Sequence, residues 1–434
     1  MNAPDADPPI DSRLEAEIIA TVAAHEAELI ALLATLVRFP SLLGAEGSAQ
    51  DYLEGLFQGM GLKTLRFAVN DTELSHLPGF SPTVGQWQRH DNVVGTHRPR
   101  HSQGRSLILN GHIDVVPVGA EELWSAPPFE PVVKEGRMYG RGAGDMKAGI
   151  AAYITAFRVL QRLGYQPAAP VFLQAVVEEE CTGNGALACL HRGFRADAAI
   201  IPEPFNHSIM SAQVGVMWLT VEVLGRPAHV LNAAHGINAI EAAFALFQCL
   251  KGLVAQWNEP RNRHPAFAHV TDPIKLNLGR IQGGEWASSV PTRCNMELRI
   301  GFYPGVSATA ARAAVEECLR AAVAADVKLK DVKYIVRYAG FQAEGFVADT
   351  THPMMSTLAG CHRRVMDTVP EWYASTATTD ARMFELYGSV PATCYGPEAT
   401  NIHGIDESVS VASTVEVTKV LAVFLARWCG LEKA

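Results

Sequence analysis

Apolar residues recur along the chain in patterns that predict helices alternating with short buried strands. Apolar positions three and four residues apart predict helices over residues 13–38 and 48–60, and further helices from Met146 and over residues 411–428. Continuous apolar runs begin at Leu107 and cover residues 169–177 and 198–201, as is typical of strands buried on both faces. The pattern therefore predicts an α/β domain in which helices flank a mixed, largely parallel sheet.

The middle of the chain follows a different order of elements. Strands are predicted over residues 214–225, 274–282, 293–302 and 332–338, with helices over residues 236–257 and 308–325. This βαββαβ order is typical of a ferredoxin-like unit. We therefore predict a disordered N-terminus (residues 1–12), a larger α/β domain in two parts (residues 13–213 and 341–434), and an inserted domain between them (residues 214–340).

Polar side chains interrupt the apolar stretch LILNGHIDVVPVG, residues 107–119. His112 and Asp114 stand two residues apart, so we expect their side chains on one face of the strand, at its C-terminal end. Open α/β sheets bind ligands at that end. The alternative is a core histidine whose hydrogen bonds are satisfied by its neighbour.

Further acidic residues and a second histidine stand at the ends of predicted elements. Asp145 lies at a glycine-bounded turn into a helix, Glu178–Glu180 follow a buried strand, and Glu203 stands between two prolines after the next strand. The alternatives are a helix cap for Asp145 and a solvated face for the acidic run. However, adjacent carboxylates at the end of a buried strand repel one another unless cations are present or some of them stay protonated. With His112 and His403, these carboxylates form a donor set suited to two divalent ions, such as zinc, that share one carboxylate.

Composition and charge narrow the class of protein. The 434 residues are 48% apolar and 19% charged, with a formal net charge of −9, which predicts a globular protein and argues against nucleic acid or an anionic membrane as a partner. The eight cysteines are scattered without a C-x-x-C pair, so we expect reduced thiols and no structural zinc site. The N-terminal residues lack the apolar core of a signal peptide, and we expect a cytoplasmic protein.

The order of these motifs resembles a known family. GHIDVVPVG, GRGAGDMKAG, the acidic triple with CTGNG, PEP and the late His403 resemble the dizinc deacylases and peptidases that include acetylornithine deacetylase, succinyl-diaminopimelate desuccinylase, aminoacylase and glutamate carboxypeptidase. The resemblance covers nearly the whole chain from about residue 14. It implies hydrolysis of a small N-acyl amide with two divalent metal ions, for which zinc is the first candidate and cobalt the second. It also implies that the inserted domain is a lid through which a homodimer forms.

The resemblance assigns a role to each member of the donor set. His112 and Glu203 would bind one metal, Glu180 and His403 would bind the other, and Asp145 would bridge the two. The motifs that carry these residues occur in the order of the family's motifs. The resemblance therefore implies a complete set of metal ligands in this chain.

Two catalytic roles follow from the same resemblance. Asp114 would orient His112, as a ligating imidazole requires. Glu179 would be the general base that takes a proton from a metal-bridging water and gives it to the departing amine. The family usually has Asp before its two glutamates, and Glu178 replaces it in one alignment. If the alignment is shifted by one residue, Glu178 becomes the base and Glu179 the ligand.

Three more residues are implied to contact the substrate. His229, in GRPAHV, matches a histidine that reaches the active site of a neighbouring subunit and steadies the oxyanion. Arg382, in TTDARMF, matches an arginine that pairs with a substrate carboxylate. Ser288, in GGEWASSVP, stands where the family usually has Asn. The alternatives are a surface or core histidine for His229 and an ordinary surface ion pair for Arg382.

These features favour an N-acyl amino acid deacylase similar to acetylornithine deacetylase. The GGEWASSVP variant and the acidic triple also resemble a subgroup that includes the formylaminopyrimidine deformylases of thiamin salvage, so an N-formyl aminopyrimidine is the alternative substrate. An alternative of another class is a metal-stabilised binding protein that has lost catalysis. A serine hydrolase is disfavoured because no G-x-S-x-G stands at a strand-to-helix turn.

Overall fold

The larger body of the molecule is built on a six-stranded sheet. The computed structural model describes residues 10–85 and 90–434. The sheet consists, in chain order, of β1 (Lys63–Ala68), β2 (Asp91–His97), β3 (Leu107–His112), β7 (Val171–Val176), β8 (Ala198–Ile201) and β16 (Ala392–Cys394). In space the order is β1-β2-β7-β3-β8-β16; the last four run parallel, whereas β1–β2 and β2–β7 pair antiparallel. The predicted α/β class with a mixed, largely parallel sheet is confirmed.

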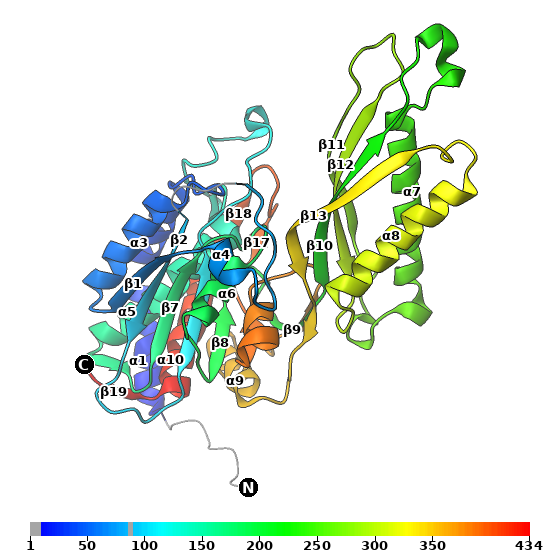
Figure 1. Cartoon of the computed structure of the whole chain (residues 1–434). Helices are drawn as coiled ribbons and strands as arrows, with labels where there is room; N and C mark the ends of the chain where they lie inside the picture. Colours follow the sequence, from blue (N-terminus) through cyan, green and yellow to red (C-terminus); the bar gives the residue numbers. More distant parts are fainter. Residues whose placement is uncertain (1–9, 86–89) are drawn as a thin grey trace.

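Helices surround this sheet (Figure 1). They are α1 (Ser12–Ala24), α2 (Glu26–Val37), α3 (Gly47–Gly59), α4 (Asp71–Leu74), α5 (Ala148–Arg162), α6 (Asn184–His191), α9 (Pro353–Met366) and α10 (Val411–Cys429). α5 and α10 contact each other and β3, and α3 contacts β1 and β2. One predicted helix was wrong, because residues 13–38 form α1 and α2, bent by 55°. His25, between them, leaves the helical conformation, and its ring bonds to the carbonyl of Thr21.

The N-terminal prediction falls mostly on residues that the structure does not describe. Residues 1–9 of the predicted disordered segment 1–12 lie outside the described residues. Helix α1 already begins at Ser12, where the side chain of Asp11 accepts a hydrogen bond from the backbone N–H of Arg13. The first helix therefore begins one residue earlier than predicted.

Smaller sheets complete the larger body. They contain β14 (Phe346–Val347), β9 (Ile209–Gln213) and β15 (Trp372–Ser375); β17 (Ala399–Thr400), β18 (Ser408–Ser410), β5 (Arg137–Tyr139) and β4 (Val132–Lys134); and β19 (Leu431–Lys433) with β6 (Tyr165–Pro167). The pairing of β18 with β5 matters most for the site, because Ser408 lies opposite Tyr139. This pairing joins the loop that carries His403 to the strand that leads into the Asp145 turn.

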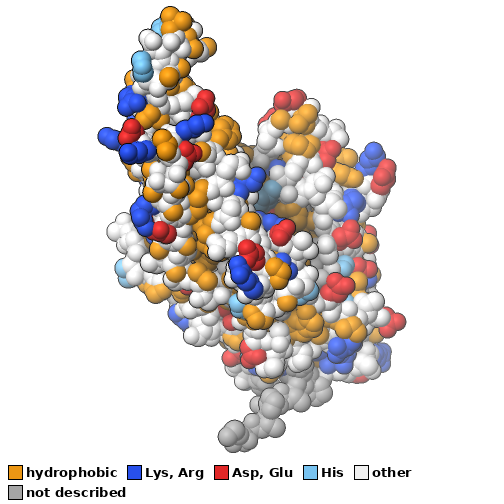
Figure 2. Space-filling model, turned by 90° about the vertical axis from the view of Figure 1, so that its right-hand side faces the viewer, with side chains coloured by type: hydrophobic (Ala, Val, Ile, Leu, Met, Phe, Trp, Pro, Cys, Tyr) orange, Lys and Arg blue, Asp and Glu red, His pale blue; other side chains and the backbone are white. Residues whose placement is uncertain are grey.

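A second unit projects from this body (Figure 1). Its elements follow the predicted βαββαβ order: β10 (Gly215–Leu224), α7 (Ala239–Asn258), β11 (Leu276–Gly283), β12 (Arg293–Phe302), α8 (Ala308–Ala325) and β13 (Lys333–Ala343). The strands pair in the order β11-β12-β10-β13, which is the ferredoxin-like arrangement. α7 is long and apolar enough to cross a membrane by length and composition, but it packs on β10, β11 and β12. From the side, Figure 2 shows a hollow where this unit meets the larger body.

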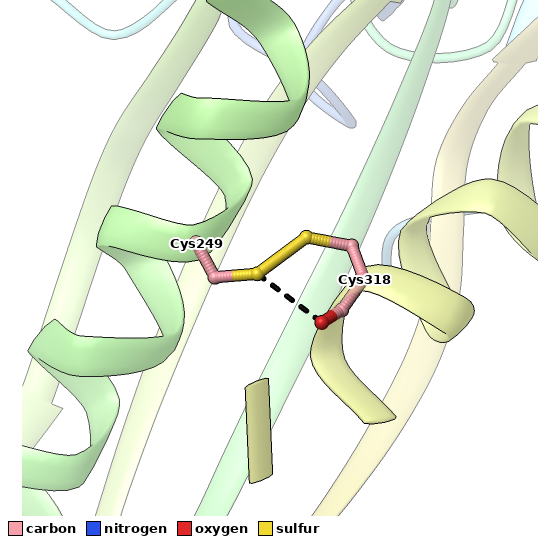
Figure 3. Close-up of a disulfide and its surroundings, with 2 residues drawn as sticks. All are labelled: Cys249 and Cys318. Atoms are coloured by element: carbon pink, nitrogen blue, oxygen red, sulfur yellow. Dashed lines mark hydrogen bonds between the residues drawn. A yellow bond between two sulfur atoms is a disulfide. The ribbon is translucent and has the colours of Figure 1, made fainter. Parts of the chain in front are cut away.

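The expectation of reduced thiols throughout was wrong for one pair of cysteines. Cys249 on α7 and Cys318 on α8 form a disulfide, with their Cα atoms 6.7 Å apart (Figure 3). The side chains of the other six cysteines are buried. Because α7 and α8 contact each other, cysteines 69 residues apart in sequence face one another. The sequence spacing alone contains no sign of this neighbourhood.

Candidate metal centre

Three predicted ligands meet where two parallel strands end. His112 is the last residue of β3, and Glu203 follows β8, its parallel neighbour in the sheet. The Nε2 atom of His112 lies 3.1 Å from Asp145 Oδ1 and 3.7 Å from Glu203 Oε1. The His112 and Glu203 side chains are buried. This group combines one imidazole with two carboxylates.

A second group shares Asp145 with the first. The other oxygen of Asp145, Oδ2, lies 3.4 Å from His403 Nε2, and Glu180 Oε2 lies 3.1 Å from the same nitrogen. Glu180 follows β7, the other parallel neighbour of β3. His403 comes from a loop more than 200 residues later, where its backbone is left-handed with a φ of 61°. In each group the potential ligand atoms lie within 4.8 Å of one another.

Burial and the close approach of the side chains shift the pKa values of these two groups. Burial raises the pKa of Glu203 well above its ordinary value. Burial also opposes ionisation of Asp145, yet hydrogen bonds to His112 and His403 hold its pKa below the usual range. The carboxylates of Glu180 and Asp145 outweigh burial and raise the pKa of His403 to about 11. Divalent ions compensate such a concentration of buried carboxylates, and imidazole with carboxylate is a donor set that zinc accepts.

Glu179 lies beside the first group without taking part in either. Its Oε2 atom is 3.8 Å from His112 Nε2, and its Oε1 atom is buried without a hydrogen-bond partner among the described residues. Burial raises the pKa of this carboxyl well above its ordinary value. A carboxyl group with a raised pKa is suited to accept and return a proton near neutral pH.

Asp114 supports the acidic turn as well as the histidine. The Nδ1 atom of His112 bonds to the backbone carbonyl of Asp114 at 2.9 Å, whereas the Asp114 carboxylate is 3.8 Å from that nitrogen. The carboxylate accepts hydrogen bonds from the backbone N–H groups of Glu179 and Glu180, at 3.4 and 3.1 Å. Burial raises the pKa of Asp114 to about 7. The carboxylate therefore fixes the segment that carries both glutamates.

Comparisons with known proteins show the family of this chain. The profile of Peptidase family M20/M25/M40 matches residues 108–427, which is most of the chain. The chain belongs to this family. N-formyl-4-amino-5-aminomethyl-2-methylpyrimidine deformylases resemble it over nearly their whole length: the Bacillus subtilis enzyme is 28% identical over 95% of this chain and 97% of its own, and the Halalkalibacterium halodurans enzyme is 29% identical over 96% and 98%.

Two solved structures share the fold of this chain. A di-peptidase from Saccharomyces cerevisiae has a TM-score of 0.79 at 13% identity, and human carnosine dipeptidase 1 has a TM-score of 0.75 at 16% identity. Each alignment covers 96% of this chain and 99% of the other. The family match over residues 108–427 confirms the suspected family. Among the two predicted substrates, the curated relatives match the formylaminopyrimidine.

Glu178 points into a separate buried cluster of the M20 chain. Its backbone is left-handed, with a φ of 65°, and its carboxylate lies 2.6 Å from His90 Nε2 and 2.5 Å from the Thr182 hydroxyl. Although burial opposes it, hydrogen bonds to Glu178 and Glu46 raise the pKa of His90 to about 9. The sequence does not predict the roles of His90 and Thr182, since no local pattern relates His90 to a residue 88 positions later.

The predicted substrate residue Arg382 is completely buried. Its Nη2 atom donates to the carbonyl of Thr182 at 2.6 Å and its Nη1 atom to the carbonyl of Thr379 at 3.0 Å. The alternative of a surface ion pair is therefore wrong. Asp380 nearby is also buried, and neither of its carboxylate oxygens has a hydrogen-bond partner among the described residues. In this structure the Arg382 guanidinium therefore donates hydrogen bonds to backbone carbonyls.

His229 and Ser288 lie together, but in the projecting unit. Both are exposed, and the backbone N–H of Val230 donates to the carbonyl of Ser288 at 3.2 Å. A surface cavity of about 590 Å³ lies between the two segments, lined by Val230, Trp286 and Ser289 among others. These segments connect β10 to α7 and β11 to β12, at the end of the unit far from the six-stranded sheet (Figure 1). The structure thus brings seven of the predicted residues together, places Arg382 beside them, and places His229 and Ser288 elsewhere.

Proposed function

We propose that this M20 protein hydrolyses a small N-formyl or N-acyl amide with two divalent metal ions. Zinc is the first candidate for these ions and cobalt is the second. The observation that carries the proposal is the pair of ligand groups that share Asp145, with Glu179 beside them. His112 and Glu203 would hold one ion, and Glu180 and His403 the other. The direction of the Glu178 side chain supports Glu179 as the base and Glu180 as the ligand, because Glu178 is already engaged by His90 and Thr182.

The protein's own groups would move the proton. Bound divalent ions supply a water of lowered pKa and polarise an amide carbonyl. Glu179 would take the proton of that water, because its Oε1 atom has no partner among the described residues and burial raises its pKa. Glu179 would then give the proton to the departing amine. The carboxylate of Asp114 would keep Glu179 in place through the backbone hydrogen bond.

The structure and the relatives favour the formylaminopyrimidine over an acyl amino acid. Arg382 would have to leave two backbone carbonyls before it could bind a substrate carboxylate. An N-formyl aminopyrimidine has no carboxylate and makes no such demand. The relatives named as pyrimidine deformylases align with this chain over nearly its full length and over nearly their own. We therefore rank the formylaminopyrimidine first and an N-acyl amino acid, as in acetylornithine deacetylase, second.

A substrate panel tests this ranking. The zinc-loaded protein would be assayed for amine release from N-formyl-4-amino-5-aminomethyl-2-methylpyrimidine, N-acetylornithine and N-succinyl amines. We expect turnover of the formyl compound, loss of activity with a chelator, and recovery with zinc or cobalt. Turnover only of acyl amino acids, weakened in Arg382→Ala, would reverse the ranking. Two bound metals without any turnover would revive the binding-protein alternative.

A matched pair of variants tests the general base. Glu179→Gln removes the proposed base, whereas Glu178→Gln changes the neighbouring carboxylate that faces His90. We expect Glu179→Gln to bind both metals and to lower kcat about 10²- to 10⁴-fold, the range typical of a lost general base. Glu178→Gln should keep most of the catalytic rate. The opposite order would mean that the alignment shifted by one residue is correct.

We further propose a cytoplasmic homodimer in which His229 serves the active site of the other subunit. Its exposure at the far end of the projecting unit supports this proposal, because no described contact links it to the ligands of its own chain. Subunits of His229→Ala and Glu179→Gln, each inactive alone, would be dissociated and mixed. A hybrid dimer would then contain one site with both residues intact, so activity should return. Persistent inactivity of verified hybrids would place His229 outside the site.

A further inference from the structure

Asp145 takes part in both ligand groups, and Glu407 holds its backbone. Oε1 of Glu407 accepts hydrogen bonds from the backbone N–H groups of Gly144 and Asp145, each at 3.0 Å. Oε2 accepts a hydrogen bond from Arg141 Nη1 at 2.5 Å. The side chains of Glu407 and Arg141 are buried. A charged acceptor thus fixes the two peptide groups that lead into the shared ligand.

Glu407 lies in the same loop as His403, the histidine of the second ligand group. Glu407 follows His403 by four residues, yet it bonds to Asp145 from 262 residues away. His403 is the only histidine of the second ligand group. One side chain therefore joins two distant segments, each of which supplies a ligand.

Packing around the turn leaves it little freedom to move away from this carboxylate. A Cβ atom added to Gly144 would lie 2.6 Å from the Cβ of Ala399 and 3.4 Å from Glu407 Oε1. Glycine is therefore required where the turn passes Ala399. On the other side, Arg141 also donates to the carbonyl of Pro117 at 3.3 Å, and its guanidinium lies 5.2 Å from the ring centre of Trp124.

We propose that Glu407 is a positioning residue that sets the distance between Asp145 and His403, with Arg141 as its counterion. The proposal rests on the proposed function, because it concerns the same pair of metal sites. A partner that orients a metal ligand typically contributes 10- to 100-fold to metal affinity. Glu407 orients its ligand through the backbone, so it leaves both carboxylate oxygens of Asp145 available.

Metal binding to the full chain tests the proposal without any substrate. Glu407→Ala removes both acceptors, whereas Glu407→Gln keeps one oxygen for the two N–H groups and leaves Arg141 without its carboxylate. Glu398→Gln is the matched control. Glu398 lies just before β17, is half exposed, and pairs with Arg137 of β5 at 2.9 Å instead of with a proposed metal ligand. For each protein, zinc affinity is measured by competition with a chelator, and the visible absorption of the cobalt-loaded form reports ligand geometry.

We expect Glu407→Ala to lose zinc affinity about 10- to 100-fold and to change the cobalt spectrum, with a smaller loss for Glu407→Gln and none for Glu398→Gln. If Glu407→Ala does not fold, Glu407→Gln carries the test alone. Wild-type affinity and an unchanged cobalt spectrum in a folded Glu407 variant would overturn the proposal. Failure of the wild-type protein to bind metal would instead overturn the proposed function, so the two failures can be distinguished.

Discussion

Gly149 provides a sharp test of how the fold holds Glu203. It lies in the first turn of α5, where an added Cβ atom would stand 2.2 Å from the backbone carbonyl oxygen of Pro202. Real Cβ contacts keep at least 3.0 Å, so the helix and the Pro202 segment must separate by about 0.8 Å in Gly149→Ala. Glu203, a proposed metal ligand, directly follows Pro202 in the chain. Ligand distances at metal sites are held to about ±0.2 Å, so this shift exceeds the tolerance of the site.

The expected loss of stability follows from two opposing effects. Overpacking a well-packed interior costs about 1–3 kcal/mol, and a clash between two backbones belongs at the upper end of that range. Replacement of a helical glycine by alanine gains up to about 1 kcal/mol. We therefore expect the free energy of unfolding of metal-free Gly149→Ala to fall by about 1–2 kcal/mol, together with weaker zinc binding.

Gly55→Ala is the matched control for this substitution. Gly55 lies in the exposed face of α3, and an added Cβ atom would meet nothing within 4 Å. The same chemical change should therefore stabilise the protein by about 0.5–1 kcal/mol. Urea unfolding of both variants, without metal, gives the comparison. If Gly149→Ala were as stable as Gly55→Ala and bound zinc normally, the packing argument for Glu203 would be refuted.

Three further outcomes can be checked with unfolding and metal analysis. Cys249→Ser should lower the free energy of unfolding by up to about 4 kcal/mol, as expected for a loop of 69 residues, and a reductant should then have no further effect. His90→Gln should cost most near pH 6, because a pKa raised from 6.5 to about 9 stabilises the fold fully below pH 6.5 and less as the pH rises through 9; a loss independent of pH would contradict the His90–Glu178 pairing. Elemental analysis of the native protein should find two equivalents of a divalent metal per chain, and His403→Ala should retain one.

Elements whose ends are marked by capping or turn residues could be predicted closely. Strand β8 has the predicted bounds, as do β12 and α8, whose helix begins after the capping residue Ser307. The meeting of the proposed metal ligands could also be predicted, because each of these residues stands at the end of a strand or at a turn. Carboxyl ends of neighbouring parallel strands lie together, so His112, Glu180 and Glu203 had to converge once β7, β3 and β8 were parallel neighbours.

Features that depend on long-range partners could not be predicted. The pairs His90–Glu178 and Arg141–Glu407 join residues 88 and 266 positions apart, and either member alone looks like an ordinary polar residue. The disulfide could not be predicted for the same reason, because α7 and α8 become neighbours only in the folded protein. The break between α1 and α2 depends on one residue, His25, within an otherwise regular apolar pattern. Burial of Arg382 followed from no local signal.

The two ends of the projecting unit lie side by side. Strand β10 begins the unit, β13 ends it, and Val216 pairs with Ala343 across the two strands. Paired residues of antiparallel strands are only about 5 Å apart, so a link of two or three residues could replace the whole segment without stretching the chain. All five proposed metal ligands come from outside that segment. Excision of the segment would therefore leave all five proposed ligands in one shorter chain, which makes the junction of β10 and β13 the natural place to shorten the protein.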